Sequence, residues 1–377
     1  MDHEGKFWDE VSGTQLNTEE VIAARLEEIK QLQSHEVYEK VPTSECWEST
    51  GRTPVKVQWI DINKGDTFNH EYRSRLVAKE IKMDKRLDLF AATPPLEAKK
   101  MLFSAAVTEG IGFHPGVREW GTKIDFIDIS RAFFQADAIR EVYVELPQED
   151  SEPGMCGKLK KSMYGTRDAA QNWGMAYTQF MQSIGFERGK SSPCVFKHTE
   201  KELSCVVHGD DFAVLGWSKQ LDWYWTQLSN KFQSKHRGRI GPEESDLKEI
   251  RILNRVVSWT PRGITYEADQ RHVEICLQEV GLNDSSKGIS IPIDRSAKDH
   301  RNRNAVVNST TESEILSPCA ATKYRGIVAR MNYLGQDRSE IQFAVKELGK
   351  EMSNPTQASW TRMKRLLRYL KGVPRAV

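Results

Sequence analysis

Three aspartates occupy positions where a carboxylate needs a cationic partner. Asp128 lies in the apolar segment 123–129, and Asp210 and Asp211 interrupt the apolar segment 203–215. The pattern of 203–215 predicts a β-hairpin with both carboxylates at its tip. Burying an unpaired charge is costly. If segment 123–129 lies beside the hairpin, all three carboxylates converge at one end of a sheet and can share a cation.

Converging carboxylates suit a hard divalent cation. Mg²⁺ favours oxygen ligands, keeps several waters and takes its remaining ligands from substrate phosphates. Two such ions, about 3.5–4 Å apart, can activate a hydroxyl and stabilise a leaving pyrophosphate during in-line displacement. A bare Gly-Asp-Asp triplet is more often a surface turn, but the flanking apolar strands and the upstream Asp128 favour a metal site. We therefore expect Mg²⁺, or Mn²⁺ in its place, at Asp128, Asp210 and Asp211.

The composition limits the class of protein. A chain of 377 residues exceeds the size at which single cores usually stop growing, which predicts about two or three subdomains. No segment approaches the roughly 18 consecutive apolar residues of a membrane span. The N-terminal segment lacks the apolar core of a signal peptide, so we expect an intracellular protein that is not secreted. The six cysteines are scattered without a CxxC spacing, which argues against a zinc site or a disulfide framework.

The charge pattern allows nucleic-acid binding only through local clusters. The formal net charge is +1, which by itself does not indicate a nucleic-acid partner. Basic residues gather in the segments 73–86 and 362–371. Each cluster is either an ordinary solvated face or a contact for phosphates, which would bind without sequence preference and with strong dependence on salt.

The apolar periodicity predicts both helices and strands. We expect helices at 17–35, 96–108, 169–184, 217–232, 339–352 and 356–371, and strands within 55–77 on either side of a turn at 64–66, at 123–129, at 141–146 and in the 203–215 hairpin. The role of the first helix is expected to be structural. This order suits an α+β domain with helices on one face of an antiparallel sheet. The polar segment 294–323 is predicted to be a flexible linker.

Several blocks occur in the order found in one family. They resemble YKARLVAKG at 71–79, DVKTAFL at 127–134, LKKSLYGLKQAPRAW at 158–173, YVDD at 208–211, and the blocks preceding a ribonuclease H domain at 324–325, 333–334 and 364–372. So many ordered blocks make chance convergence improbable. The chain therefore resembles the reverse transcriptase of copia-type LTR retrotransposons, which is a fragment of a Pol polyprotein.

The resemblance implies a right-hand polymerase fold of fingers, palm and thumb, with an antiparallel palm sheet and a helical C-terminal region. It divides the chain into an N-terminal helical lead at 1–50, fingers and palm at 51–255, the start of the thumb at 256–293, the linker at 294–323 and a helical connection at 324–377. The ribonuclease H domain that follows such a connection in the family is expected to be absent.

The resemblance also implies roles for single residues. It makes Asp128, Asp210 and Asp211 the metal ligands, and it makes Arg75 and Lys79 the cations that neutralise an incoming triphosphate. Asp125 is the alternative to Asp128 on the same predicted strand. Only Asp128 stands five residues before the aromatic Phe133, as the family pattern requires.

The phenylalanine at this position bears on sugar choice. An aromatic ring just beyond the metal-bearing strand can lie under the deoxyribose and exclude a 2′-hydroxyl. Phe133 is the expected residue, and its neighbour Phe134 fits a core position better. The alternative is that Phe133 only packs the core.

Some residues depart from the family pattern. His208 and Gly209 change the packing of the hairpin tip, and Glu80 replaces a glycine. Asp168 stands where the family's glutamine would touch the nucleotide, and a carboxylate there repels a triphosphate unless Arg167 or a metal compensates. One helical turn later, Gln171 can supply the missing amide.

The implied function is RNA-directed and DNA-directed DNA synthesis. Its partners would be an RNA template, a DNA primer–template and dNTPs, and its location the cytoplasm, within a virus-like particle if the element is intact. RNA-dependent RNA polymerases also carry Gly-Asp-Asp, but Phe133 argues against that alternative. Asp168 supports a different alternative, a catalytically silent remnant that still folds and binds nucleic acid.

Overall fold

The computed structural model describes residues 6–65, 69–81, 89–114, 121–269, 271–283, 285–293 and 314–374. The chain divides into two compact units, residues 1–239 and 240–377. Part of the first basic cluster, the end of the predicted turn at 64–66 and most of the predicted linker lie outside the described residues.

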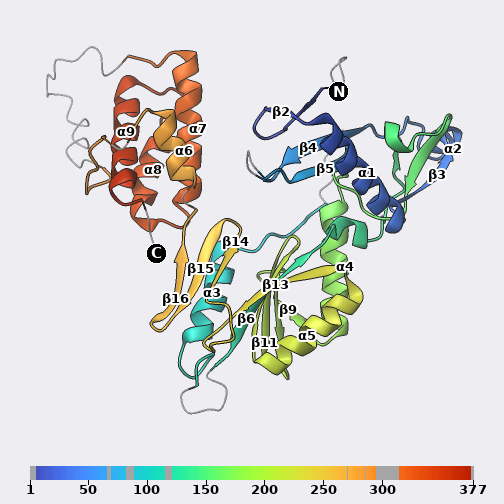
Figure 1. The fold of residues 1–377 in the computed structure, drawn as a ribbon, viewed down its shortest axis with the longest axis horizontal. Coiled ribbons are helices and arrows are strands. Elements are labelled where there is room, and N and C mark those ends of the chain that lie inside the picture. Colours follow the sequence, from blue (N-terminus) through green and yellow to red (C-terminus); the bar gives the residue numbers. More distant parts are fainter. Residues whose placement is uncertain are drawn as a thin grey trace. The chain divides into compact units, whose positions relative to one another are not determined.

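A six-stranded sheet forms the centre of the first unit (Figure 1). Its strand order is β13-β6-β12-β11-β10-β9, with bounds Ser234–Ile240, Lys123–Ile129, Asp211–Gly216, Leu203–His208, Val195–His198 and Glu187–Arg188. β11 and β12 form an antiparallel hairpin, and β12 pairs antiparallel with β6. The predicted hairpin and its predicted neighbour strand are therefore confirmed.

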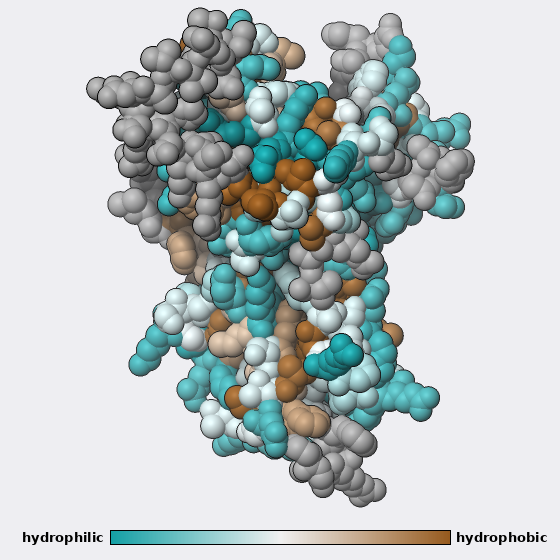
Figure 2. All heavy atoms as spheres, turned by 90° about the vertical axis from the view of Figure 1, so that its left-hand side faces the viewer, coloured by the Kyte–Doolittle hydropathy of each residue, from teal (hydrophilic) through white to brown (hydrophobic). Residues whose placement is uncertain are grey.

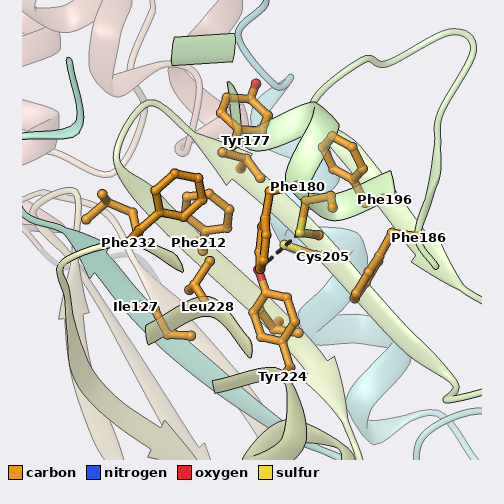
Figure 3. Close-up of a cluster of buried hydrophobic side chains, with 14 of the residues drawn as sticks. Ile127, Tyr177, Phe180, Phe186, Phe196, Cys205, Phe212, Tyr224, Leu228 and Phe232 are labelled. Atoms are coloured by element: carbon orange, nitrogen blue, oxygen red, sulfur yellow. Dashed lines mark hydrogen bonds between the residues drawn. The ribbon is translucent and has the colours of Figure 1, made fainter. Parts of the chain in front are cut away.

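Helices cover both faces of this sheet. Helices α4 (Ala169–Ser183) and α5 (Ser218–Lys231) pack an aromatic core on one face, where Phe180, Phe212, Tyr224 and Phe232 meet (Figure 3). Helix α3 (Leu96–Val107) lies against the other face, with Phe103 facing Phe126. The prediction that helices occupy one face only is wrong, because β6 and β12 are apolar at successive positions and so bury both of their faces.

The rest of the first unit builds on helix α1 (Thr18–Ser34) and the hairpin of β4 (Val57–Asn63) and β5 (Tyr72–Ala78). A three-stranded sheet has the order β3-β8-β7, with bounds Tyr38–Pro42, Met155–Leu159 and Tyr143–Val144. Smaller elements are β1 (Phe7–Trp8), β2 (Gln15–Leu16), α2 (Thr43–Thr50) and the 3₁₀ turns η1 (Ala132–Gln135) and η2 (Gln148–Asp150). The strand predicted at 141–146 is regular only over its two central residues.

The second unit combines a small sheet with a helical core. The sheet has the order β14-β15-β16, with bounds Glu249–Ile252, Arg255–Thr260 and Gly263–Glu267. The helices are α6 (Arg271–Glu279), α7 (Pro318–Leu334), α8 (Gln342–Gly349), with a 3₁₀ turn η4 (Ser339–Ile341) before it, and α9 (Gln357–Gly372), and their apolar faces share one core. Helix α7 begins inside the predicted linker, because Ser317 caps it and Pro318 takes its first position.

The surface is mostly hydrophilic, with patches of apolar residues between polar ones on the face that Figure 2 displays. Folded proteins generally expose some apolar area, so scattered patches need no special explanation. Among the helices that the structure describes, none combines the length and the hydropathy needed to cross a membrane.

Candidate active site

The three predicted aspartates meet at one end of the six-stranded sheet. Asp211 opens β12 and pairs directly with Asp128 of β6, and the carbonyl of Asp210 accepts a 2.9 Å hydrogen bond from the backbone N–H of Ile129. The turn between β11 and β12 consists of Gly209 and Asp210, and only Gly209 has a positive φ, of 65°. That pattern matches a type II′ turn, which requires glycine at its first central position and so explains Gly209.

The carboxylates of this site repel one another. Burial and the neighbouring charge of Asp210 raise the pKa of Asp211, and Asp128 adds to the effect. Lys99 and Arg237 oppose it, the latter with a guanidinium nitrogen 3.9 Å from the Asp211 carboxylate. Carboxylates that destabilise one another's charged forms are suited to a cation.

The donor set suits a metal that takes only part of its ligands from protein. Within the described residues, no three or more His, Cys, Asp or Glu side chains are arranged to hold a metal ion by themselves. Mg²⁺ usually binds one or two carboxylates and completes its shell with water and substrate phosphates. Asp128 and Asp211, paired across two strands with Asp210 beside them, match that requirement.

Asp125, the alternative on the same strand, has different surroundings. It is fully buried, and Arg239 donates to its two oxygens at 2.6 and 2.9 Å while His236 lies 3.1 Å away. Burial alone would raise its pKa, but the hydrogen bonds from Arg239 and His236 hold the pKa below its usual value. Asp125 is thus paired within the protein.

A tryptophan fixes the turn that carries Asp210. The indole N–H of Trp173 on α4 donates a 2.8 Å hydrogen bond to the carbonyl of Gly209, and the side chain is buried. Phe232 and Tyr177 pack edge-on against the same ring. The sequence pattern predicts Trp173 as a core residue of an amphipathic helix, and only the tertiary structure reveals that it also holds the turn.

Arg75 and Phe133 lie around one tyrosine. The Arg75 guanidinium lies 4.7 Å from the centre of the Tyr164 ring, and the ring of Phe133 lies 4.9 Å from it. Burial raises the pKa of Tyr164, and Asp210 is among the charges that add to this. Phe133 is half-buried, whereas Phe134 is 1% exposed, which confirms the core position predicted for Phe134. Tyr164 therefore joins the expected nucleotide residues, although the sequence gives no separate signal for it.

Lys64, at the end of β4, is a second cation whose charge is influenced by Asp128. Burial lowers the pKa of Lys64, and the positive charges of Arg73 and Arg75 lower it further, while Glu71 and Asp128 oppose the shift. Cations that repel one another beside a carboxylate site form a receptor for an anion with several charges. The sequence placed Arg73 in a basic cluster but gave no role to Lys64.

Lys79 lies apart from this group. It follows the end of β5, and it lines a cavity of about 520 Å³ together with Phe7, Trp59 and Arg25. Its backbone N–H donates to the carbonyl of Lys56 at 2.7 Å. Of the two cations expected at a triphosphate, Arg75 lies over the ring of Tyr164, and the role of Lys79 there stays a prediction.

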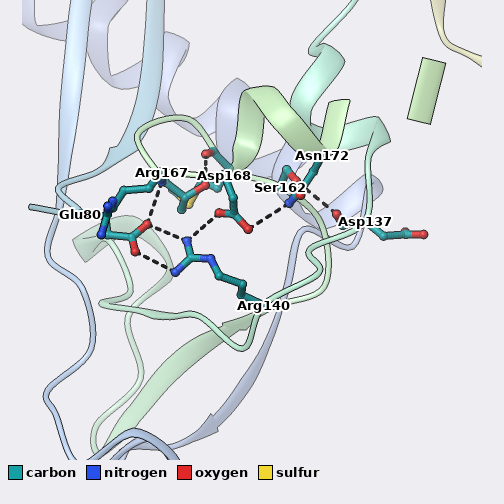
Figure 4. Close-up of polar contacts among 9 residues, drawn as sticks. Glu80, Asp137, Arg140, Ser162, Arg167, Asp168 and Asn172 are labelled. Atoms are coloured by element: carbon teal, nitrogen blue, oxygen red, sulfur yellow. Dashed lines mark hydrogen bonds and ion pairs between the residues drawn. The ribbon is translucent and has the colours of Figure 1, made fainter. Parts of the chain in front are cut away.

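Asp168 is paired with Arg140, a partner that the sequence did not indicate (Figure 4). Arg140 donates to Asp168 at 2.6 Å and to both oxygens of Glu80 at 3.0 Å. The Arg140 and Asn172 hydrogen bonds outweigh burial and lower the pKa of Asp168. Two departures from the family pattern, Glu80 and Asp168, are thus joined by one guanidinium. Arg167 contributes its backbone N–H, which donates to Glu80 at 2.8 Å.

Gln171 lies on the first turn of α4. Its side-chain carbonyl oxygen is buried and accepts no hydrogen bond from the described residues. An acceptor left in that state is costly unless a further donor reaches it. The amide predicted to replace the family's glutamine is therefore present on this helix with an unused acceptor.

Comparisons with known proteins identify one family for this chain. Residues 47–242 match the model of the reverse transcriptase (RNA-dependent DNA polymerase) family. The Pol polyprotein of transposon TNT 1-94 from Nicotiana tabacum is 25% identical over 94% of this chain, and that of transposon RE2 from Arabidopsis thaliana is 27% identical over 85%. The chain spans 25% and 21% of the length of these two relatives.

Two solved structures also resemble the chain. They are a foamy viral protease–reverse transcriptase in complex with double-stranded DNA, and one in complex with an RNA/DNA hybrid. Their TM-scores are 0.44 and 0.43, at 10% and 12% identity, covering 95% of this chain and 58% and 38% of theirs.

Proposed function

Because the chain belongs to the reverse transcriptase (RNA-dependent DNA polymerase) family, in its copia-type retrotransposon branch, we propose that it copies RNA and then DNA by adding deoxynucleotides to a primer. Its substrates are an RNA template, a DNA primer–template and dNTPs. Its location is the cytoplasm, within a virus-like particle if the element is intact.

The observation that supports this proposal most directly is the pairing of Asp128 with Asp211 across β6 and β12. Asp210 stands beside them on a turn held by Trp173. Asp128, Asp210 and Asp211 would hold Mg²⁺, which would supply charge neutralisation and activation of the attacking 3′-hydroxyl. The carboxylates fix where the reacting phosphate lies, and the hydrogen bond from Trp173 restricts how far the turn can move.

The residues around Tyr164 would hold the nucleotide. Arg75, with Lys64 and Arg73 near it, would neutralise the triphosphate, since burial and the neighbouring positive charges lower the pKa values of Lys64 and Arg73. The ring of Phe133 supports the sugar from the turn after β6. In this assignment the β4–β5 hairpin belongs to the fingers and the six-stranded sheet to the palm.

The remaining segments take the roles of thumb, helical connection and helical lead. The thumb begins in 256–293, and 324–377 is the helical connection, with 1–50 as the helical lead. A primer–template would lie against basic residues of these parts through phosphate contacts, with affinity that falls as salt rises.

A catalytically silent remnant is the second candidate, suggested by Asp168. The ion pair with Arg140 weakens that suggestion, because the carboxylate is already compensated and does not present an unopposed charge to a triphosphate. An RNA-dependent RNA polymerase is the third candidate, and the half-buried aromatic Phe133 disfavours it.

Primer extension tests the proposal. The purified chain, given an RNA template, a DNA primer and dNTPs with Mg²⁺ or Mn²⁺, is expected to extend the primer. Binding of primer–template without any extension in either metal would favour the silent remnant.

Sugar preference separates the two polymerase classes. Phe133→Val is expected to admit ribonucleotides while dNTP use falls modestly, because the variant opens space for a 2′-hydroxyl. Phe134→Val is the matched control, and it should lower stability and leave sugar preference unchanged. An unaltered preference in Phe133→Val would reopen the RNA-polymerase alternative.

A further inference from the structure

Helix α1 carries two buried charged residues, and it lies outside the residues that match the family model. Arg25 and Glu28 are 5% and 4% exposed. Charged side chains are seldom buried to this degree without partners. The partners of Arg25 and Glu28 therefore indicate which parts of the fold helix α1 holds in place.

Arg25 has structural partners. It donates to the two Asp61 oxygens at 3.2 and 2.6 Å and lies between the rings of Phe7 and Trp59, at 4.5 and 5.1 Å. Ser74 donates to the same Asp61 at 2.6 Å. These contacts join α1 to the β4–β5 hairpin, which agrees with the structural role expected for the helix.

Glu28 has a different partner. One of its oxygens accepts a 3.0 Å hydrogen bond from Nε of Arg131, and the other is buried and has no hydrogen-bond partner among the described residues. A buried carboxylate oxygen without a donor is costly. Glu28 therefore holds Arg131 with one oxygen and keeps the other without a donor among the described residues.

Arg131 holds an unusual backbone conformation. Its φ is 48°, in the left-handed region that non-glycine residues rarely adopt, and it lies between Asp128 and Phe133. Such strain persists where the surroundings enforce it, and it is found frequently at functional sites. Glu28 is the residue that holds its side chain.

Arg131 and Glu28 also influence the pKa of Arg73 on the β4–β5 hairpin. Burial lowers the pKa of Arg73, and the positive charges of Arg75 and Arg131 contribute to the shift, while Tyr164 and Glu28 oppose it. Arg131 therefore shares one neighbourhood with the cations that face Tyr164. The chain segments that meet here are α1, β5 and the turn after β6.

We propose that Glu28 of α1 is a positioning residue for the nucleotide site, which holds Arg131 and the turn after Asp128 in place for the triphosphate of an incoming dNTP. This inference rests on the proposed polymerase function. It makes α1 part of the nucleotide site, although the helix lies outside the matched family region.

The test compares Glu28→Gln with Glu27→Gln, the same change at an exposed neighbour on the same helix. Glu28→Gln should raise KM for dTTP about tenfold and change kcat little, because loss of uniform binding raises KM alone. Glu27→Gln should match the unaltered chain. A fall in thermal stability of Glu28→Gln without any change in KM would overturn the inference and leave α1 purely structural.

Arg131→Gly provides a second variant that is expected to fold. Glycine adopts φ near 48° without strain, which offsets part of the cost of leaving the buried Glu28 carboxylate without Arg131, while KM for dTTP should increase about as much as in Glu28→Gln. The double variant should be no worse than either single one, because both changes remove the same interaction. An additive result, or a normal KM in Arg131→Gly, would contradict the proposed coupling.

Binding of dTTP to the chain with a chain-terminated primer–template, measured by isothermal titration calorimetry, separates the two levels of the argument. If the unaltered chain binds dTTP and Glu28→Gln binds it equally well, only this inference fails. If the unaltered chain neither binds dTTP nor extends a primer, the polymerase function fails and this inference fails with it.

Discussion

Strand β6 carries two aspartates three positions apart, and their surroundings are opposite in kind. Asp125 is fully buried and paired with Arg239 and His236, and its pKa is lowered. Asp128 lies on the other face of the strand, opposite Asp211, whose pKa is raised by burial and by neighbouring carboxylates. Asp125 is therefore compensated within the protein, whereas Asp211 carries a charge that its neighbouring carboxylates disfavour.

The difference teaches how to separate structural from functional carboxylates. A carboxylate whose charge is compensated within the protein contributes to folding, whereas carboxylates that repel one another reduce stability and are retained for another purpose. Asp125 of β6 and Asp211 of β12 should therefore respond to substitution in opposite directions.

The largest expected change in stability follows from the loss of Asp125. Asp125→Ala should lower the free energy of unfolding by about 3–5 kcal/mol, because it leaves Arg239 and His236 without their buried partner. Urea denaturation measures this change. Asp222→Ala, which removes the exposed partner of Arg239, is the control and should cost at most about 1 kcal/mol. Equal costs for the two variants would remove the contrast.

Breaking the ion pairs of Arg140 should also lower stability, but by less than the loss of Asp125. Its guanidinium is 25% exposed, so Arg140→Met should cost about 2 kcal/mol, less than the roughly 3–5 kcal/mol of a fully buried pair. Lys161→Met removes an exposed ion pair with Asp137 and should cost about 1 kcal/mol or less.

A triple variant refines this prediction. Combining Arg140→Met with Glu80→Gln and Asp168→Asn removes the uncompensated charges and should recover part of the lost stability, since neutral replacement of an ion-pair network is often tolerated. If the triple variant were less stable than Arg140→Met alone, Arg140 would not be compensating these two carboxylates.

The smallest expected effect has the opposite sign. Asp211→Asn should raise the free energy of unfolding at pH 7 without metal, because it removes a partly buried charge that Asp210 and Asp128 disfavour. Because the folded pKa of Asp211 lies above its usual value, its cost is present at neutral pH and is relieved as pH falls through that folded pKa.

Asp125 gives the reverse pH dependence. Its folded pKa is lowered, so its contribution is present above the unfolded pKa of about 3.8 and is lost as pH falls through the folded value. At pH 7, Asp211→Asn should therefore be more stable than the unaltered chain, and Asp125→Asn should be less stable. Both differences in the free energy of unfolding should shrink as the pH falls. Destabilisation by Asp211→Asn at pH 7 would contradict the proposed repulsion.

Local patterns predicted much of the fold. The cap at Asn17 and the apolar spacing after it located α1, and the apolar segments around Gly209 located the hairpin and its carboxylates. These features depend on neighbours in sequence, so they can be read from it. The start of α7 was missed because a polar composition concealed the Ser317 cap.

Contacts between distant segments could not be predicted. Arg140 meets Glu80 and Asp168, and Glu28 meets Arg131, only because the chain folds these segments together. The role expected for Lys79 beside Arg75 stays a prediction, and the structure adds that Lys79 lines a cavity with Phe7 and Trp59.

The central claim is that Asp128, Asp210 and Asp211 act as one metal-binding unit. Single-turnover primer extension with Mg²⁺ by Asp210→Asn tests it most directly, with Asp222→Asn as an exposed aspartate control. The account predicts that Asp210→Asn loses at least about a hundredfold in rate, as when one group stabilising a transition state is removed, with folding intact and the control unaffected. Extension by Asp210→Asn at the rate of the unaltered chain would contradict it.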